Sequence, residues 1–115
     1  VIAVSGFEEF LARHSASPRA PDALYWLAES LAAQSLHTDA RQRFLEVRQT
    51  YPTSVKVPDA TLRAALEAIK IGEHETAVRE LRELITTYQG SDAAVNGCMQ
   101  LDRLGQSRPA ACQVP

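Results

Sequence analysis

The feature of this sequence that most constrains its fold is an internal repeat. When the chain is shifted by 37 residues, residues 20–54 align with 57–91, so that Pro21 meets Pro58. A shift in the opposite direction brings residues 3–17 into the same register. Repeats with a period of about 20–50 residues build arrays in which each unit buries its apolar face against its neighbours. The sequence therefore predicts a repeat array.

Each repeat unit has the pattern of two helices joined by a short turn. Pro21 and Asp22 suit a first helical turn, because proline lacks the N–H that would stay unbonded there and a carboxylate favours the positive end of the helix dipole. Leu24, Leu27 and Leu31 then follow at helical spacing. The same reasoning predicts helices over 1–14, 21–34, 38–51, 58–71, 75–88 and 92–103, followed by a flexible tail at 105–115.

Antiparallel helix pairs that repeat about every 34 residues are typical of tetratricopeptide repeats (TPR), which this pattern resembles. Ala28 and Ala40 stand where two helices approach too closely for a larger side chain, and Phe44 fills the gap to the next pair. The second unit is the weaker match, since Thr61 and Gln89 depart from the pattern. We therefore predict an all-α fold of about six helices in a short right-handed superhelix. The expected TPR domain covers 1–104, with a half repeat at 1–19, repeats at 20–56 and 57–91, and a terminal helix at 92–104.

The stretch IGEHETAVREL places His74 beside Glu75 at the start of a predicted helix, as in the HExxH helices that bind zinc. Such a site needs a second histidine four residues after the first, and that position is Val78. His37 lies one repeat away, too far to share an ion. We therefore expect His37 and His74 to be turn residues that pack against the turn, and we expect no metal site.

Composition and motifs exclude several classes of function. A net charge of −2 and a pI of about 5.9 give no basic surface for nucleic acid. The sequence has no apolar run long enough to span a membrane, no glycine-rich phosphate-binding motif and no nucleophile elbow. We therefore expect a protein that is not an enzyme and uses no cofactor. The chain begins without methionine or a signal peptide, so we also expect a processed or excised segment.

Two cysteines stand near the C-terminal end of the sequence. Cys98 and Cys112 lack the spacing and the number of ligands typical of a zinc site. A disulfide bond in an oxidising compartment and two free thiols are both compatible with this pair. The sequence leaves the two alternatives open.

Several segments resemble one particular group of TPR proteins. The linkers SASPRAPDALYWL and YPTSVKVPDA, and the later YQGSDAA, are similar to the repeat junctions of the periplasmic Tol-Pal-associated proteins of the YbgF/CpoB type. The segment ALYWLAES is the most specific part, and the likeness extends from about residue 7 to residue 104. The turn SLHTDA and the run Thr61-Leu62-Arg63 depart from the pattern of that family. The chain thus resembles the C-terminal TPR domain of these proteins.

This resemblance implies an adaptor rather than an enzyme. Members of the family carry a trimerising coiled coil before the TPR domain, associate with the inner-membrane protein TolA, and help coordinate outer-membrane constriction with peptidoglycan synthesis during cell division. The implied location is the periplasm, and the implied partner is a TolA-like protein or peptide, without nucleic-acid binding or membrane insertion. The alternatives are a structural oligomerisation module, with homo-oligomers formed through helix 1–14 or a coiled coil, and a generic TPR scaffold unrelated to Tol-Pal.

The first helix of each TPR pair lines the concave face of the superhelix, so this face is the expected binding surface. Tyr25 and Leu62 suggest an apolar floor with acidic margins, suited to an amphipathic helix or an extended peptide. The alternative is that Leu62, Leu66 and Ile69 are core residues of a tightly wound array, and Leu66 is expected to be the more buried of the two leucines. The predicted binding residues are Asp22, Tyr25, Trp26, Glu29, Asp59, Leu62, Leu66, Ile69 and Lys70.

Helix 1–14 corresponds to the second helix of a repeat whose first helix has no counterpart in the sequence. It presents Ala3, Phe7, Phe10 and Leu11, and part of this surface would lack an intramolecular partner. We expect the surface to self-associate or to meet a further N-terminal part of the parent protein.

Overall fold

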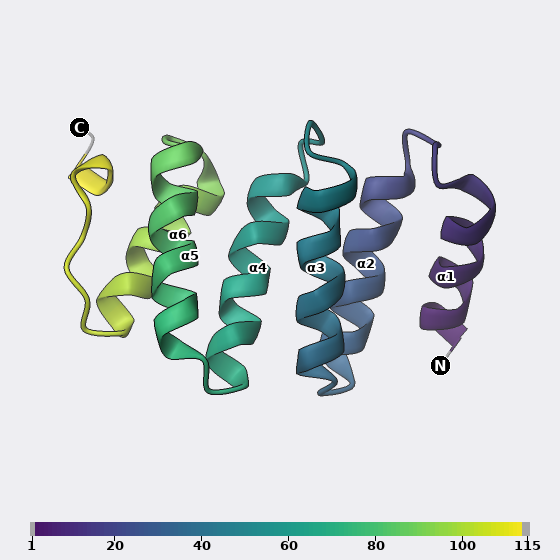
Figure 1. Ribbon diagram of the computed structural model, residues 1–115, viewed down its shortest axis with the longest axis horizontal. Helices are drawn as coiled ribbons and strands as arrows, with labels where there is room; N and C mark the ends of the chain where they lie inside the picture. Colours follow the sequence, from purple (N-terminus) through teal and green to yellow (C-terminus); the bar gives the residue numbers. More distant parts are fainter. Residues whose placement is uncertain (1, 114–115) are drawn as a thin grey trace.

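The computed structural model describes residues 2–113, which fold into a row of six α-helices (Figure 1). Neighbouring helices run antiparallel and are joined by short turns, from α1 at one end of the row to α5 and α6 at the other. The row measures 43 × 28 × 18 Å along its principal axes. No residue among those described forms a β-strand. The elements are α1 (Ile2–His14), α2 (Ala20–Ala33), α3 (His37–Thr50), α4 (Val57–Lys70), α5 (His74–Thr87), α6 (Asp92–Arg103) and the 3-10 turn η1 (Ala110–Gln113).

The predicted fold class is confirmed, and every predicted helix is present. The four helices from α2 to α5 each begin and end one residue before the predicted range. The turns repeat as well, because Ser35 and Gly72 occupy matching positions and both adopt a positive φ, at 63° and 85°. This conformation costs a residue with a Cβ about 1–2 kcal/mol and costs glycine almost nothing. The internal repeat therefore extends to the backbone of the turns.

Two buried clusters hold the row together. The first lies among α2, α3 and α4 and is centred on Phe44, whose side chain is completely buried. The second lies among α4, α5 and α6 and includes Leu81 and Leu101. Ala28 and Ala40 are both fully buried in the first cluster, which confirms that small side chains occupy this close contact between helices. Each cluster thus joins one helix pair to the next.

Buried polar bonds also cross between repeats. Arg41 on α3 binds Glu80 on α5 through two hydrogen bonds of 2.7 Å, and it also donates to the carbonyl oxygen of Ala64. A charged pair held in this bidentate geometry is among the stronger polar contacts in proteins. His37 opens α3, and its Nδ1 lies 2.6 Å from Oε2 of the buried Glu67 on α4. The expected turn residue His37 therefore does more than pack against its own turn, since it joins two repeats.

The C-terminal tail differs from the flexible segment that the sequence predicted. A disulfide bond links Cys98 on α6 to Cys112 in η1, so this one of the two alternatives for the cysteines is realised. The guanidinium of Arg108 also binds Asp102 on α6, with Nη2 lying 2.6 Å from Oδ2. Residues 105–113 are thus fastened to α6, because the disulfide and the ion pair hold them at two points. The last two residues of the predicted tail lie outside the described residues.

Candidate protein-interaction surfaces

The first helices of the pairs, α2 and α4, bring together a group of aromatic and charged side chains. The Tyr25 ring meets Trp26 edge-on at 5.3 Å and Phe44 at 5.4 Å between ring centroids. Lys56 Nζ lies 4.6 Å from the Tyr25 centroid and 5.3 Å from that of Trp26, within the range of a cation–π interaction. We define the aromatic–charged cluster as Tyr25, Trp26, Glu29, Lys56, Asp59 and Arg63.

Charges inside the aromatic–charged cluster are largely balanced. Arg63 donates from Nε to Oε1 of Glu29 at 2.5 Å, which connects α4 to α2. Burial raises the pKa of Tyr25, the carboxylates of Glu29 and Asp59 raise it further, and Arg63 partly offsets them. The Tyr25 phenol therefore stays protonated at neutral pH and keeps a hydrogen to donate. The cluster offers aromatic surface, a cation and hydrogen-bonding groups together, which is the composition of many protein interfaces.

Four of the nine predicted binding residues belong to this cluster, namely Tyr25, Trp26, Glu29 and Asp59. Ile69 and Lys70 lie at the C-terminal end of α4, about 9 Å or more along the helix beyond Arg63. Leu66 is half-buried and packs against the second core cluster. The structure thus gathers the N-terminal half of the predicted surface and leaves the α4 end apart from it.

The prediction that Leu62 is an exposed binding residue is wrong. Leu62 is only 7% exposed and belongs to the second core cluster, whereas Leu66 is half-buried. The reason is that α6 packs beside α4, and Leu62 fills the space between these two first helices together with Cys98 and Leu101. The relative exposure of Leu62 and Leu66 is therefore the reverse of the expectation.

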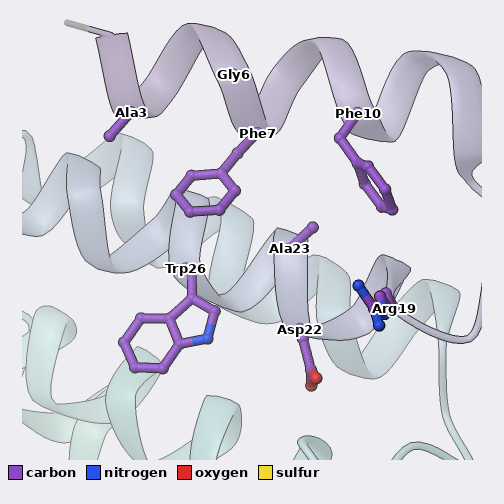
Figure 2. A pocket seen from close by; sticks show the side chains of 8 residues that line it. All are labelled: Ala3, Gly6, Phe7, Phe10, Arg19, Asp22, Ala23 and Trp26. Atoms are coloured by element: carbon purple, nitrogen blue, oxygen red, sulfur yellow. The ribbon is translucent and has the colours of Figure 1, made fainter.

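A second surface is a groove between α1 and α2, with a volume of about 540 Å³. Figure 2 shows Phe7 and Phe10 pointing from α1 toward α2, while Ala23 points from α2 toward α1. Trp26, on the α2 side, is 47% exposed. We call this hollow the α1–α2 groove, and it is lined by Ala3, Gly6, Phe7, Phe10, Arg19, Asp22, Ala23 and Trp26.

The α1–α2 groove was only partly visible in the sequence. Asp22 and Trp26 were predicted as binding residues, but on the concave face and without a connection to α1. Part of the apolar surface of helix 1–14 was expected to lack a partner, and Phe7, Phe10 and Leu11 all stay partly exposed, although Phe7 and Leu11 also pack against the first core cluster. Arg19 was missed, although its position one repeat before Lys56 marks it as part of the same arrangement.

The described residues contain neither a cluster of metal-binding side chains nor a helix that could cross a membrane. Across the described residues, no three or more His, Cys, Asp or Glu side chains gather where they could hold a metal ion. His74 is exposed at the start of α5. None of the helices in the described part of the chain has the length and apolar character needed to cross a membrane.

Comparison with known proteins agrees with the geometry of the helix pairs. Residues 2–55, which include α1, α2 and α3, match the tetratricopeptide repeat family. No curated protein matches the chain significantly. The family match concerns the repeat class and does not distinguish the Tol-Pal-associated proteins from other TPR proteins. Residues 2–55 are therefore similar to tetratricopeptide repeats, and the all-helical fold of the described residues is consistent with such repeats, which are scaffolds for protein–protein interaction.

Proposed function

We propose that this protein is a non-enzymatic adaptor of the bacterial cell envelope that binds a TolA-like partner through the aromatic–charged cluster. The observation that carries the proposal is that Lys56, just before α4, lies 4.6 Å and 5.3 Å from the ring centroids of Tyr25 and Trp26 on α2. Tyrosine, tryptophan and arginine are the residues most often found at the energetic centres of protein interfaces. This cluster is therefore the first candidate for the adaptor's binding surface.

The chemistry of the cluster suits a partner segment that is apolar on one side and carries acidic groups. Trp26 is 47% exposed, so its ring still has apolar surface to bury. Lys56, held over the two rings, would attract a carboxylate of the partner to the edge of that surface. An amphipathic helix or an extended peptide could supply both features.

The envelope location rests on two arguments. The disulfide between Cys98 and Cys112 is of the kind that persists in oxidising compartments such as the periplasm. The repeat junctions resemble those of the Tol-Pal-associated TPR proteins, and the role in coordinating outer-membrane constriction with peptidoglycan synthesis follows from that resemblance alone. The partner named here, a TolA-like protein, has the same basis.

The proposal is tested by measuring the binding of purified TolA to the chain with isothermal titration calorimetry. We expect Lys56→Glu to weaken binding about tenfold or more, because it reverses the charge beside both rings. The control is Arg79→Glu, a reversal of the same charge at an exposed position on α5, the second helix of its pair, which should leave the affinity unchanged. Binding that tolerates Lys56→Glu would remove the cluster from the interface. A chain that does not bind TolA at all would leave a TPR scaffold with another partner.

A further inference from the structure

We infer that the α1–α2 groove binds an amphipathic α-helix of a partner protein, and that this helix has the residue pattern of α2. The groove and the aromatic–charged cluster share Trp26 but are otherwise formed by different residues. The inference therefore does not depend on the envelope function proposed above.

The internal repeat identifies what the groove lacks. Phe7 corresponds to Phe44 in the next repeat and to Leu81 in the one after, since the three positions are 37 residues apart. Phe44 and Leu81 are completely buried, whereas Phe7 is only half-buried. The same contrast holds along the groove: Ala3 and Phe10 are exposed or half-buried, while their counterparts Ala40, Val47, Ala77 and Leu84 are 0–1% exposed.

The covering element in both later repeats is the first helix of the pair. α2 packs along α3 and covers Phe44 with Leu24, Leu27 and Ala28, all in one buried cluster. α4 packs along α5 in the same way. The molecule thus shows twice that this surface accepts a helix lying antiparallel to the second helix of the pair. The groove is the same surface without that helix.

Side chains at the rim of the groove specify the helix further. Arg19 corresponds to Lys56, and Lys56 lies over Tyr25 of the covering helix α2. An aromatic side chain at the matching position of the partner would give Arg19 the same cation–π contact. Trp26 corresponds to Arg63, whose carboxylate partner Glu29 also lies on the covering helix.

Because Trp26 stands where the next repeat has Arg63, the groove lacks the guanidinium that binds Glu29 in that repeat. An uncharged residue is therefore favoured at the position of the partner helix that matches Glu29. The expected partner helix carries leucines and a close-approach alanine at the spacing of Leu24, Leu27 and Ala28. It adds an aromatic residue after the first leucine and an apolar residue after the alanine.

A partner helix fits the groove better than a second copy of this chain does. In one copy, α2 and α4 are already buried between second helices, so neither is free to dock. The remaining first helix, α6, carries the tail fastened by the Cys98–Cys112 disulfide and by Arg108 on Asp102. Among the described residues, no first helix of a second copy presents the required face. The occupant that we propose is therefore a helix of a partner protein.

The probe for this inference is a synthetic peptide with the sequence of residues 19–34 and the change Trp26→Arg. Because the chain has a single tryptophan, its own Trp26 then reports on the groove without interference from the peptide. We expect a saturable blue shift of the Trp26 emission as the peptide covers the ring. A second peptide with the additional change Glu29→Leu should bind several-fold more tightly, and one with Leu24→Glu should not bind.

Two variants of the full chain test the position of the peptide. Phe10→Glu places a charge in the groove, and Ala23→Gln adds bulk where the equivalent Ala60 has no space around it. Each should weaken peptide binding about tenfold or more, with circular dichroism confirming the fold. The matched control is Ala12→Glu, which lies about 200° around α1 from Phe10 and should have no effect on affinity.

Three outcomes would overturn the inference. One is that the unmodified chain fails to bind either the first peptide or its Glu29→Leu form. Another is that both groove variants fold and bind the peptide as tightly as the control does. In the third, the chain forms dimers that Phe10→Glu converts to monomers and that the peptide does not displace. A second copy of the chain would then be the occupant of the groove.

Discussion

The two ends of this helix row differ in whether the terminal helix is covered by another part of the chain. Each repeat unit packs its apolar faces against its neighbours, so the first and last helices of an array are either covered by a cap or left with an open apolar face. At the N-terminal end, α1 leaves Phe7 and Phe10 partly exposed along a groove of about 540 Å³. At the C-terminal end, a disulfide and an ion pair hold the tail against α6. One end is open to a further helix, and the other is closed.

One position of the repeat, where the last unit has a charged residue instead of alanine, explains why the C-terminal end is closed. Ala28 and Ala65 occupy matching positions and are fully buried, where a second helix approaches closely. The next position in the register is Asp102, which is exposed and bound to Arg108. A carboxylate cannot occupy such a close contact without losing its hydration, so no further helix can pack there as α3 packs on α2. The carboxylate at this position therefore accounts for the closed end at α6.

The largest expected effect comes from placing the same charge in the second core cluster and in the open groove. Leu62→Glu buries a carboxylate in the second core cluster and should destabilise the fold by about 4 kcal/mol or more. Phe10→Glu, in the open groove, should change the free energy of unfolding by no more than about 1 kcal/mol. Urea denaturation followed by circular dichroism measures both. Comparable losses in the two variants would show that the N-terminal end is not open.

The second prediction concerns the disulfide that closes the C-terminal end. Cys112→Ala removes a bridge whose cysteines are 14 residues apart in sequence. A loop of this length stabilises a fold by about 3 kcal/mol when it constrains the unfolded chain, so this is the expected upper limit of the loss. Thermal unfolding with and without a reducing agent measures it. The reducing agent should lower the melting temperature of the unmodified chain and leave that of Cys112→Ala unchanged.

The sequence predicted the local structure well because local structure follows the repeat. The small residues at close helix contacts, the prolines near the start of α2 and α4, and the turns at Ser35 and Gly72 all recur after 37 residues. Contacts that do not recur could not be found in this way. Arg41 and Glu80 correspond to Val78 and Arg43, so the periodicity gives no sign of their buried ion pair.

The candidate surfaces were predicted only in part, for a related reason. Repeat position alone does not show which neighbour covers a residue, and Leu62 became core because α6 packs beside α4. Tyr25 occupies the matching position and stays half-buried, next to Lys56. The closure of the tail depended on whether Cys98 and Cys112 bond, and a single cysteine pair leaves that undecided.

A third prediction compares the two glycines that lie inside helices at opposite ends. At Gly6 an added Cβ meets no atom within 4 Å, so Gly6→Ala should stabilise the fold by about 1 kcal/mol through helix propensity. At Gly97 the same atom would lie 3.3 Å from Cγ1 of Ile85, inside the packed C-terminal end. Crowding should there outweigh the gain in propensity and give a net loss of up to about 1 kcal/mol. Urea denaturation of the two variants checks the opposite signs, and equal gains would contradict the difference in packing.

The smallest expected effect is an acid dependence of the C-terminal cap. The hydrogen bonds from Arg108 hold the pKa of Asp102 below its ordinary value of 3.8. Since the folded-state pKa lies below the unfolded one, the ion pair contributes its stability in full above about pH 4 and loses it as the pH falls through the folded-state value. Both side chains are well exposed, so solvent screens the pair and the contribution is small.

Melting temperatures between about pH 2 and pH 6 should fall less steeply with acid for Asp102→Asn than for the unmodified chain. Arg108→Gln should have the same effect as Asp102→Asn, because either change removes the ion pair. If both variants kept the steep acid dependence, the tail would be held by the disulfide alone, and the cap would not depend on the charge at Asp102.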